Sequence, residues 1–234
     1  MDNNLDSIAE KSLFTTPAGN TSLYKSFDIF MRFAKKGSVL ELGCAEGLMT
    51  EKIVNFFDDV AVVEGSSIFC EQLKKKLPNV EVFNSYFEDF DCDRKFDNII
   101  LGHVLEHVDD PVFVLSHIKK FLKTDGLIFA AVPNARSIHR QAAVIMGILE
   151  NEYSLNSLDI HHGHQRVFNP ESFRSVFIKA NLPISIFGGY WLKPLSNGQI
   201  EADWSEEMLD AFMDMGERYP DISGEIYIVS YCDR

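Results

Sequence analysis

Short apolar runs alternate with longer amphipathic segments along most of this chain. The apolar runs predict strands near 37–42, 59–64, 79–84, 96–102, 126–132, 184–192 and 225–232. The 3.6-residue periodicity between them predicts helices near 21–34, 47–57, 67–76, 110–123, 135–148, 170–180 and 204–217. This alternation is typical of an α/β domain whose mainly parallel, seven-stranded sheet has helices on both faces.

The first strand-to-helix turn carries the clearest chemical signal. Residues 37–47 read Gly-Ser-Val-Leu-Glu-Leu-Gly-Cys-Ala-Glu-Gly, so an apolar run contains Glu41 and ends at two glycines four residues apart. Gly43 and Gly47 remove the side chains that would keep a ligand from the backbone, and the next helix offers its free N–H groups. A plain structural turn explains this spacing equally well when it is taken alone.

The second strand favours a nucleotide-type ligand. Its apolar run ends at Glu64, about twenty residues after the turn, where a ribose-binding carboxylate belongs in a βαβ unit. A nicotinamide cofactor fits the same broad pattern, but its turn normally reads Gly-x-Gly-x-x-Gly around a pyrophosphate. Here Glu41 precedes the first glycine and Ala45 occupies the middle position. A cofactor with an amino-acid end and no phosphates accounts for both differences.

A third motif, Phe-Asp-Asn-Ile-Ile-Leu-Gly-His-Val-Leu-Glu-His-Val-Asp-Asp-Pro, occupies residues 96–111. With these three motifs the chain resembles the class I, Rossmann-like S-adenosylmethionine-dependent methyltransferases of small-molecule type, from about Ser38 to Pro133 and more loosely beyond. The resemblance implies that the last strand is antiparallel. It also implies a single domain, 1–234, in four parts: an N-terminal helical cap (1–35), a cofactor-binding core (36–133), a helical substrate lid between strands five and six (134–169), and the C-terminal part of the sheet (170–234).

The resemblance implies S-adenosylmethionine as cofactor and S-adenosylhomocysteine as product. It sets the glycine turn against the methionine portion, Glu41 near the amino group, Glu64 on the ribose and His103 near the sulfonium. Tyr86 and Phe87 stand where such families often carry an acid that holds the adenine amino group, so Glu88 or Asp89 takes over that contact. The expected cofactor contacts are Glu41, Gly43, Cys44, Ala45, Gly47, Glu64, Gly65, Ser66, Tyr86, Phe87, Glu88 and His103.

The segment 134–169 concentrates basic side chains in an otherwise acidic protein. It holds four of the seven histidines and three arginines. Arginine forks match carboxylate and phosphate geometry, which indicates an anionic acceptor beneath a lid. The expected substrate contacts are Tyr24, Arg136, Arg140, Arg166 and Lys193. Two alternatives stay open: a solvated loop without a role, and surface bridges from Arg136 and Arg140 to Glu150 or Glu152.

Methyl transfer from a sulfonium is an in-line displacement, and a hydroxyl acceptor must also lose its proton. A histidine that titrates near neutrality is the natural base, and an apolar wall would lower its pKa. The candidates are His103, His107, His161, His162 and His164. We assign no metal ligand, because the three close histidines of residues 161–164 lack a nearby acid pair and suit a turn better than a metal cage.

The strand tip reads Gly-His-Val-Leu at residues 102–105, whereas methyltransferases of amide or exocyclic nitrogens commonly show Asn or Asp followed by two prolines and an aromatic there. An oxygen acceptor is therefore preferred, with the nitrogen of an amino sugar kept open. Residues 132–140, 163–168 and 192–197 look similar to bacterial methyltransferases of surface-polysaccharide or nucleotide-linked sugar pathways. A non-catalytic S-adenosylmethionine-binding protein and an NAD-dependent oxidoreductase remain as rivals.

Charge and composition limit the classes of partner that the protein is expected to bind. A net charge of −13 over 234 residues opposes binding to a nucleic acid backbone, so a small-molecule acceptor is expected. No apolar run reaches 18 residues and no basic-then-apolar leader is present, which predicts a soluble protein without membrane insertion. Four scattered cysteines fit a reducing cytoplasm. The acidic stretch 201–214 is either a solvated helix face or the contact of a homodimer.

Overall fold

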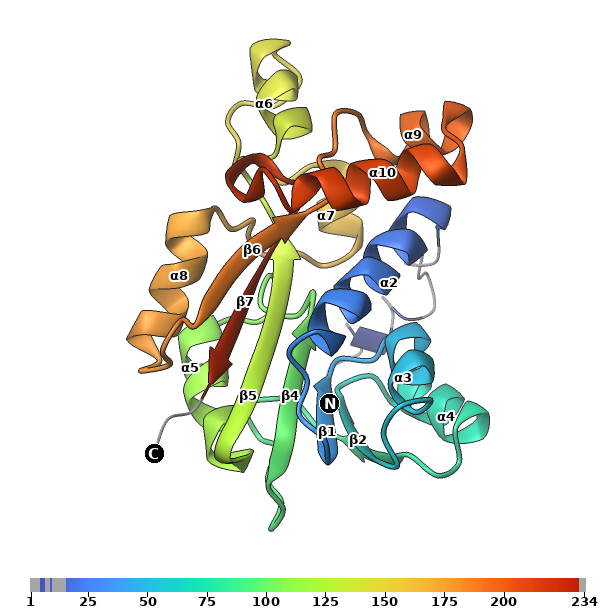
Figure 1. Ribbon diagram of the computed structural model, residues 1–234, viewed down its shortest axis with the longest axis vertical. Helices are drawn as coiled ribbons and strands as arrows, with labels where there is room; N and C mark the ends of the chain where they lie inside the picture. The colour runs from blue at the N-terminus through green and yellow to red at the C-terminus, as the bar shows by residue number, and fades with distance from the viewer. Residues whose placement is uncertain (1–4, 7–8, 10–15, 232–234) are drawn as a thin grey trace.

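The computed structural model describes residues 5, 6, 9 and 16–231, so the first part of the expected N-terminal cap and Cys232 lie outside the described residues. Its seven strands form one sheet in the order β3-β2-β1-β4-β5-β7-β6 (Figure 1). The strands are β1 (Ser38–Leu42), β2 (Asp59–Glu64), β3 (Glu81–Asn84), β4 (Phe96–Gly102), β5 (Leu122–Pro133), β6 (Ile186–Tyr190) and β7 (Glu225–Tyr231). Strand β7 runs antiparallel between β5 and β6, while β1 to β5 pair in parallel. The predicted fold class is confirmed.

The helices of the described part of the chain fall close to the predicted segments. They are α2 (Pro17–Met31), α3 (Leu48–Ile53), α4 (Ser67–Lys76), α5 (Pro111–Ile118), α6 (Ile138–Ile145), α7 (Ser157–His161), α8 (Pro170–Lys179), α9 (Asn197–Asp203) and α10 (Glu206–Gly216). Two short helices, α7 and α9, were not predicted. The helix expected over 110–123 ends early, because a 3₁₀ turn at Lys119–Phe121 leads into β5 at Leu122.

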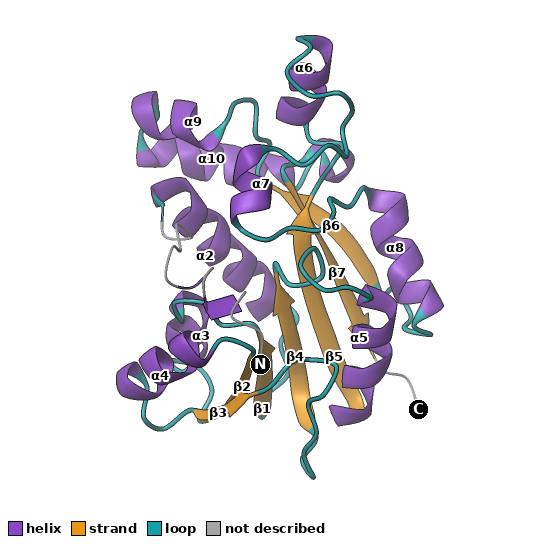
Figure 2. Ribbon diagram, turned by 180° about the vertical axis from the view of Figure 1, so that it is seen from behind, coloured by secondary structure: helices purple, strands orange, loops and turns teal. Residues whose placement is uncertain are grey.

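Helices cover both faces of the sheet. Successive residues of β5 alternate between two apolar clusters: Ile128 and Ala130 pack with α5 and α8, whereas Phe129 and Ala131 pack with α2, α3 and α10. This is the period-two alternation of a strand buried on both faces. The two ribbon views show α5 and α8 on one side of the sheet and α2, α3 and α4 on the other (Figures 1 and 2). The helices thus bury both faces of the sheet. The edge at which the parallel strands have their carboxyl ends, called the carboxyl edge below, is formed by the connecting loops.

The insertion 134–169 rises from that edge. Its two ends are tied together, because Asn134 forms a parallel β-bridge with Phe168 and Ala135 N donates to Phe168 O at 2.8 Å. Helix α6 projects away from the sheet at the top of Figure 1. A search of the described helices found none that is both long and apolar enough to cross a membrane.

Candidate functional site

The turn after β1 adopts a backbone that favours glycine. Gly43, Ala45 and Gly47 have φ angles of 72°, 43° and 80°, in the left-handed region. A methyl group on Gly43 would lie 3.1 Å from Val104 Cγ2, and one on Gly47 would lie 2.6 Å from Leu73 Cδ1. The turn is therefore specified both by its backbone angles and by its close packing against the loop after β4 and against α4.

Glu64, at the end of β2, faces this turn. Its Oε2 accepts hydrogen bonds from the backbone N–H of Cys44 at 3.1 Å and of Ala45 at 3.4 Å, and its Oε1 accepts from Ser66 N at 2.8 Å. The residue is 8% exposed. Burial raises the pKa of Glu64, while these three hydrogen bonds act against the shift. The acid expected on the ribose thus lies directly beside the glycine turn.

Glu41 lies on the other side of the turn, facing α3. It is 2% exposed and accepts a hydrogen bond from Thr50 Oγ1 at 2.6 Å. Burial raises the pKa of Glu41 to about 8, the Thr50 hydrogen bond opposes that shift, and the charge of Glu64 adds to it. Without a ligand, Glu41 is therefore mostly uncharged near neutrality.

Aromatic side chains lie beside the glycine turn, at the carboxyl ends of the parallel strands. Phe87 Cζ is 3.6 Å from the position of a methyl group on Gly43, and Tyr86 Cδ1 is 3.6 Å from the corresponding position on Gly65. Glu88 is half-buried, and Asp6 accepts a hydrogen bond from Ser66 Oγ at 2.7 Å. The expected cofactor residues thus converge on one edge. Asp6 was not foreseen, since nothing in the sequence links it to the second strand.

His103 follows β4 and has a left-handed φ of 58°. Its Nδ1 lies 3.4 Å from Glu106 Oε1 and 3.8 Å from Glu225 Oε2, and its Nε2 is 3.3 Å from the Tyr190 hydroxyl. Burial acts to lower the pKa of His103, but Glu225 and Glu106 outweigh it and raise that pKa to about 9. The expectation of a lowered histidine pKa is wrong for His103, because these carboxylates were not foreseen.

Two further histidines meet Glu106 from different segments. His107 belongs to the same loop, and His164 comes from the insertion; their ring centroids are 4.7 Å apart in an edge-to-face arrangement. Gln165 N donates to Glu106 O at 2.9 Å, which ties the insertion to the loop. Burial lowers the pKa of His107. The structure thus gathers His103, His107 and His164 around one carboxylate.

The remaining histidines that were considered as bases lie at the edge of this group. His161 is exposed at the end of α7, and its ring centroid is 5.7 Å from that of His162. The His162 ring centroid is 6.0 Å from that of His164. Burial lowers the pKa of His162 to about 4, and the neighbouring histidines add to the effect. A role for either residue as base stays a prediction.

The three arginines of the insertion are engaged in structural contacts. Arg136 forms a two-pronged pair with Glu171 of α8, at 3.0 and 2.6 Å. Arg140 is buried and donates to Asp159 Oδ2 at 3.1 Å and to the Glu152 carbonyl at 3.0 Å. The alternative of surface bridges to Glu150 or Glu152 is therefore wrong in its partners: Arg136 pairs with Glu171, and Arg140 pairs with Asp159.

Arg166 also supports the architecture. Its guanidinium donates to the backbone carbonyls of Val108 and Asp109, the latter at 3.0 Å. It therefore braces the loop that carries His103 and Glu106. An anion-binding role for the three arginines would require them to leave these partners.

Lys193 and Tyr24 complete the expected substrate contacts. The Lys193 Nζ lies 4.5 Å from the centroid of the Trp191 ring and forms no ion pair with any other described side chain. Burial lowers the pKa of Lys193 to about 8, while Glu225 acts in the opposite direction. The ring of Tyr24 lies under Lys52 Nζ, at 4.1 Å, on the side of α3. Lys193 is thus the better placed of the two for an acceptor anion.

A surface hollow of about 550 Å³ lies at the opposite edge of the sheet, near the amino ends of the strands. Its lining includes Gly37, Asp59, Asp97 and Lys123, and the last two form an ion pair at 2.7 Å. Ligands of open α/β sheets bind at the carboxyl ends of the strands, where the glycine turn and His103 lie. We therefore locate the functional site at the carboxyl edge.

Comparison with known proteins agrees with this geometry. A family model described as a methyltransferase domain matches residues 22–184. A ubiquinone biosynthesis O-methyltransferase of Actinobacillus pleuropneumoniae is 27% identical over 175 residues, which cover 70% of this chain and 72% of that protein. The mitochondrial ubiquinone biosynthesis O-methyltransferase of Dictyostelium discoideum is 26% identical over 177 residues, 68% of this chain and 54% of that protein.

Among solved structures, the N-methyltransferase NodS of Bradyrhizobium japonicum, in complex with S-adenosyl-l-homocysteine, superposes with a TM-score of 0.63 over 100% of both chains. Its sequence is only 13% identical, so this likeness concerns the fold. The family match covers more than half of the chain and includes all three sequence motifs. The chain therefore belongs to the methyltransferase domain family and is an S-adenosylmethionine-dependent methyltransferase of the class I, Rossmann-like fold.

Proposed function

We propose that this enzyme transfers the methyl group of S-adenosylmethionine to a hydroxyl oxygen of a small acceptor. The observation that carries the proposal is the contact between the glycine turn and the loop after β4. Val104 Cγ2 lies 3.1 Å from the position of a methyl group on Gly43, and Val104 directly follows His103. The cofactor turn and the polar cluster around Glu106 are thus neighbours, as an in-line transfer requires.

Two further observations support an oxygen acceptor. The relatives from Actinobacillus and Dictyostelium are both named O-methyltransferases. In addition, Glu106, Glu225 and the Tyr190 hydroxyl surround His103 with groups that can orient a hydroxyl and move its proton. The association with surface-polysaccharide or nucleotide-linked sugar pathways stays a prediction, since neither relative carries such a name.

We further propose that the acceptor carries a negative charge, which Lys193 binds. Lys193 lies at the same edge of the sheet as Glu225, and no described acid pairs with it. A cytoplasmic location fits the free thiols of Cys44, Cys70 and Cys92. The homodimer stays a prediction.

The test is methyl transfer by the purified enzyme to a panel of acceptors. The panel contains a dihydroxybenzoate, its neutral methyl ester, a nucleotide-linked sugar and an amino sugar, with formation of S-adenosylhomocysteine as readout. Mass spectrometry and NMR then locate the new methyl group. We expect O-methylation, with the KM for the carboxylate acceptor below that for its ester. Methylation confined to the amino sugar nitrogen would contradict the proposal.

A single variant, measured with a matched pair of acceptors, tests the anionic contact. Lys193→Met should raise the KM of the charged acceptor and leave that of its neutral ester nearly unchanged. The affinity of this variant for S-adenosylmethionine, measured by calorimetry, serves as the control. An equal change in KM for both acceptors would contradict a specific role of Lys193.

A further inference from the structure

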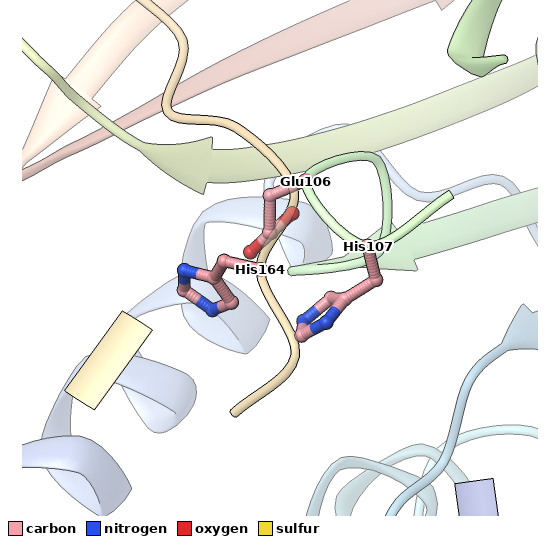
Figure 3. Close-up of side chains that lie close together, drawn as sticks. All are labelled: Glu106, His107 and His164. Carbon is pink, nitrogen blue, oxygen red and sulfur yellow. The ribbon is translucent and has the colours of Figure 1, made fainter. Parts of the chain in front are cut away.

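Three side chains with metal-binding atoms converge beside the proposed acceptor position. Glu106, His107 and His164 each offer one ligand atom, and these atoms all lie within 4.8 Å of one another. Figure 3 shows the carboxylate and the two rings pointing toward one another. Glu106 and His107 come from the loop after β4, and His164 comes from the insertion, so the cluster joins two segments that are far apart in the sequence.

The carboxylate of Glu106 is in an unusual environment. The residue is 0% exposed, and neither carboxylate oxygen receives a hydrogen bond of normal geometry from any described residue. The nearest cationic group is His103 Nδ1, at 3.4 Å from Oε1. A buried carboxylate is costly unless its lone pairs are satisfied or it coordinates a metal. The described side chains around Glu106 therefore leave its carboxylate able to bind a further electropositive partner.

We propose that Glu106, His107 and His164 bind a divalent transition-metal ion. Two imidazoles and one carboxylate are the ligand set of catalytic zinc sites and of sites that hold other first-row metals with open positions. Metal–nitrogen and metal–oxygen distances are about 2.0–2.2 Å, so two ligand atoms of one ion lie at most about 4.4 Å apart. The three ligand atoms lie within 4.8 Å of one another, so small side-chain rotations are enough to bring them to these separations.

The surroundings fix the geometry of two of these ligands. Gln165 N donates to Glu106 O at 2.9 Å, which holds the insertion in register with the loop after β4. The Asp159 carboxylate lies 3.4 Å from His164 Nδ1, and Asp159 is itself paired with Arg140. Carboxylates that contact a metal-binding imidazole in this way orient its ring. Arg140 thus acts indirectly: it positions Asp159, and Asp159 in turn orients His164.

The metal would activate the acceptor, and this step rests on the proposed function. An acceptor hydroxyl bound at an open position of the ion has a lowered pKa and releases its proton to solvent. The oxygen lone pair then forms a bond to the methyl carbon of S-adenosylmethionine. The carbon–sulfur bond breaks and its electron pair stays on sulfur, which gives neutral S-adenosylhomocysteine. No oxidant or reductant is needed, and no free histidine has to serve as base.

The sequence did not suggest this site, because the histidines at 161–164 have no acidic pair near them in the chain. The carboxylate is supplied by Glu106, whose loop the fold brings against His164. No metal ligand was assigned, because the prediction considered local spacing alone. The tertiary structure supplies the missing ligand.

Metal titration of the full chain tests the site without reference to any acceptor. Protein depleted of metal with EDTA and dialysed is titrated with Zn²⁺ by calorimetry and with Co²⁺ by visible absorption. We expect one ion per chain and a Co²⁺ spectrum typical of mixed nitrogen and oxygen ligands. Glu106→Gln, His107→Gln and His164→Gln should each weaken Zn²⁺ binding by more than about 100-fold, since losing even a group that only orients a ligand costs about 10–100-fold.

His161→Gln is the matched control. It removes an exposed histidine from the same insertion but none of the three ligands, so its affinity for Zn²⁺ should equal that of the wild type. Thermal melts show whether each variant folds; if Glu106→Gln does not fold, the partly exposed His164 carries the test. Absence of stoichiometric binding by the wild type, or wild-type affinity in His164→Gln, would overturn the proposal.

A second measurement separates this proposal from the proposed function. We expect metal-depleted enzyme to bind S-adenosylmethionine normally but to methylate a hydroxyl acceptor at least about 100-fold more slowly, with recovery on adding Zn²⁺ or Mn²⁺. Full O-methylation without metal would overturn the metal proposal and leave the proposed function intact. A different outcome is that the wild type binds one Zn²⁺, the three variants do not, and methylation occurs only at nitrogen. That outcome would uphold the metal site and overturn the oxygen acceptor.

Discussion

Replacing Glu41 with glutamine removes a buried acid whose effect on stability follows from its surroundings. The Glu41 side chain is 2% exposed, and burial raises its pKa from 4.5 to about 8, with the Thr50 hydrogen bond opposing the shift. The unfolded chain loses this proton near pH 4.5, whereas the folded protein keeps it to about pH 8. The folded state therefore binds more protons across this window, and its free energy of unfolding falls as the pH rises.

The magnitude follows from the two pKa values. Each pH unit between them costs about 1.4 kcal/mol, so the accumulated cost is about 3 kcal/mol at pH 7 and nearly zero below pH 4.5. Glu41→Gln keeps the shape of the side chain and still accepts the hydrogen bond from Thr50, but it has no proton to lose. We expect the variant to be more stable than the wild type by up to about 3 kcal/mol at pH 7 and equally stable near pH 4.

Urea denaturation of the cofactor-free protein between pH 4.5 and 8 measures this difference. Glu71→Gln, at an exposed position of α4, is the matched control and should differ from the wild type by a small amount that does not grow with pH. A Glu41→Gln difference that is the same at pH 5 and pH 7 would refute the reasoning from burial.

The same residue links cofactor binding to proton release. If the amino group of S-adenosylmethionine binds beside Glu41, its positive charge lowers the pKa of that carboxyl. Binding at pH 7 should then release about one proton, measured as a difference in calorimetric enthalpy between phosphate and Tris buffers. Glu41→Gln should release none and bind the cofactor about 10–100-fold more weakly, the value of a charged hydrogen bond. Identical enthalpies in both buffers would exclude this contact.

Three further predictions concern the turn, the insertion and the acceptor. Gly43→Ala should weaken S-adenosylmethionine binding at least about tenfold in calorimetry, whereas Gly147→Ala, with the same φ of 72° and no atom within 4 Å, should not. Arg140→Met breaks a buried ion pair and should lower the free energy of unfolding by about 3–5 kcal/mol, against less than about 1 kcal/mol for Arg136→Met, whose pair is exposed. The KM of an anionic acceptor should rise above about pH 8, where Lys193 loses its charge.

The secondary structure was predictable where local signals agreed with the fold. Helix α4 matches its predicted bounds, because Ser66 caps its start and three lysines complement the dipole of its last turn. The start of β5 was missed, since the preceding helix was predicted to run to residue 123 and the strand to begin at 126, whereas β5 begins at Leu122. The strand passes through residues 123–126 with a register shift against β4 and a left-handed φ of 62° at Asp125. A bulge of this kind depends on the neighbouring strand and leaves little trace in the sequence.

The two helices that were not predicted do have sequence signals. Asn156 and Asp159 form a capping box at the start of α7, and Ser196 and Gln199 form one at the start of α9. Such pairs, three residues apart, mark a helix start. In α9 the glycine of the first turn obscured that signal, because glycine disfavours helix interiors. Short helices of five and seven residues also offer too few apolar positions for a periodicity argument.

The conformation of the glycine turn was predictable because it is local, whereas the cluster around His103 and Glu106 is assembled from distant segments. Glu225 is the first residue of β7, yet it lies at the carboxyl edge of the parallel strands because β7 runs in the opposite direction. Its cross-strand partners are Pro133, at the end of β5, and Tyr190, at the end of β6. A search for ligands only after the ends of strands therefore passes over Glu225, although the resemblance implied that the last strand is antiparallel.

The antiparallel strand also determines the charge of the acceptor side. Glu106 and Glu225 are both buried, and His103 lies between them with its Nδ1 at 3.4 and 3.8 Å from their oxygens. Lys193 also faces Glu225, so two groups that carry positive charge oppose the two carboxylates, and this edge is compatible with the anionic acceptor proposed above. The reversed strand thus supplies the carboxylate of Glu225, whose charge favours the protonated forms of both His103 and Lys193.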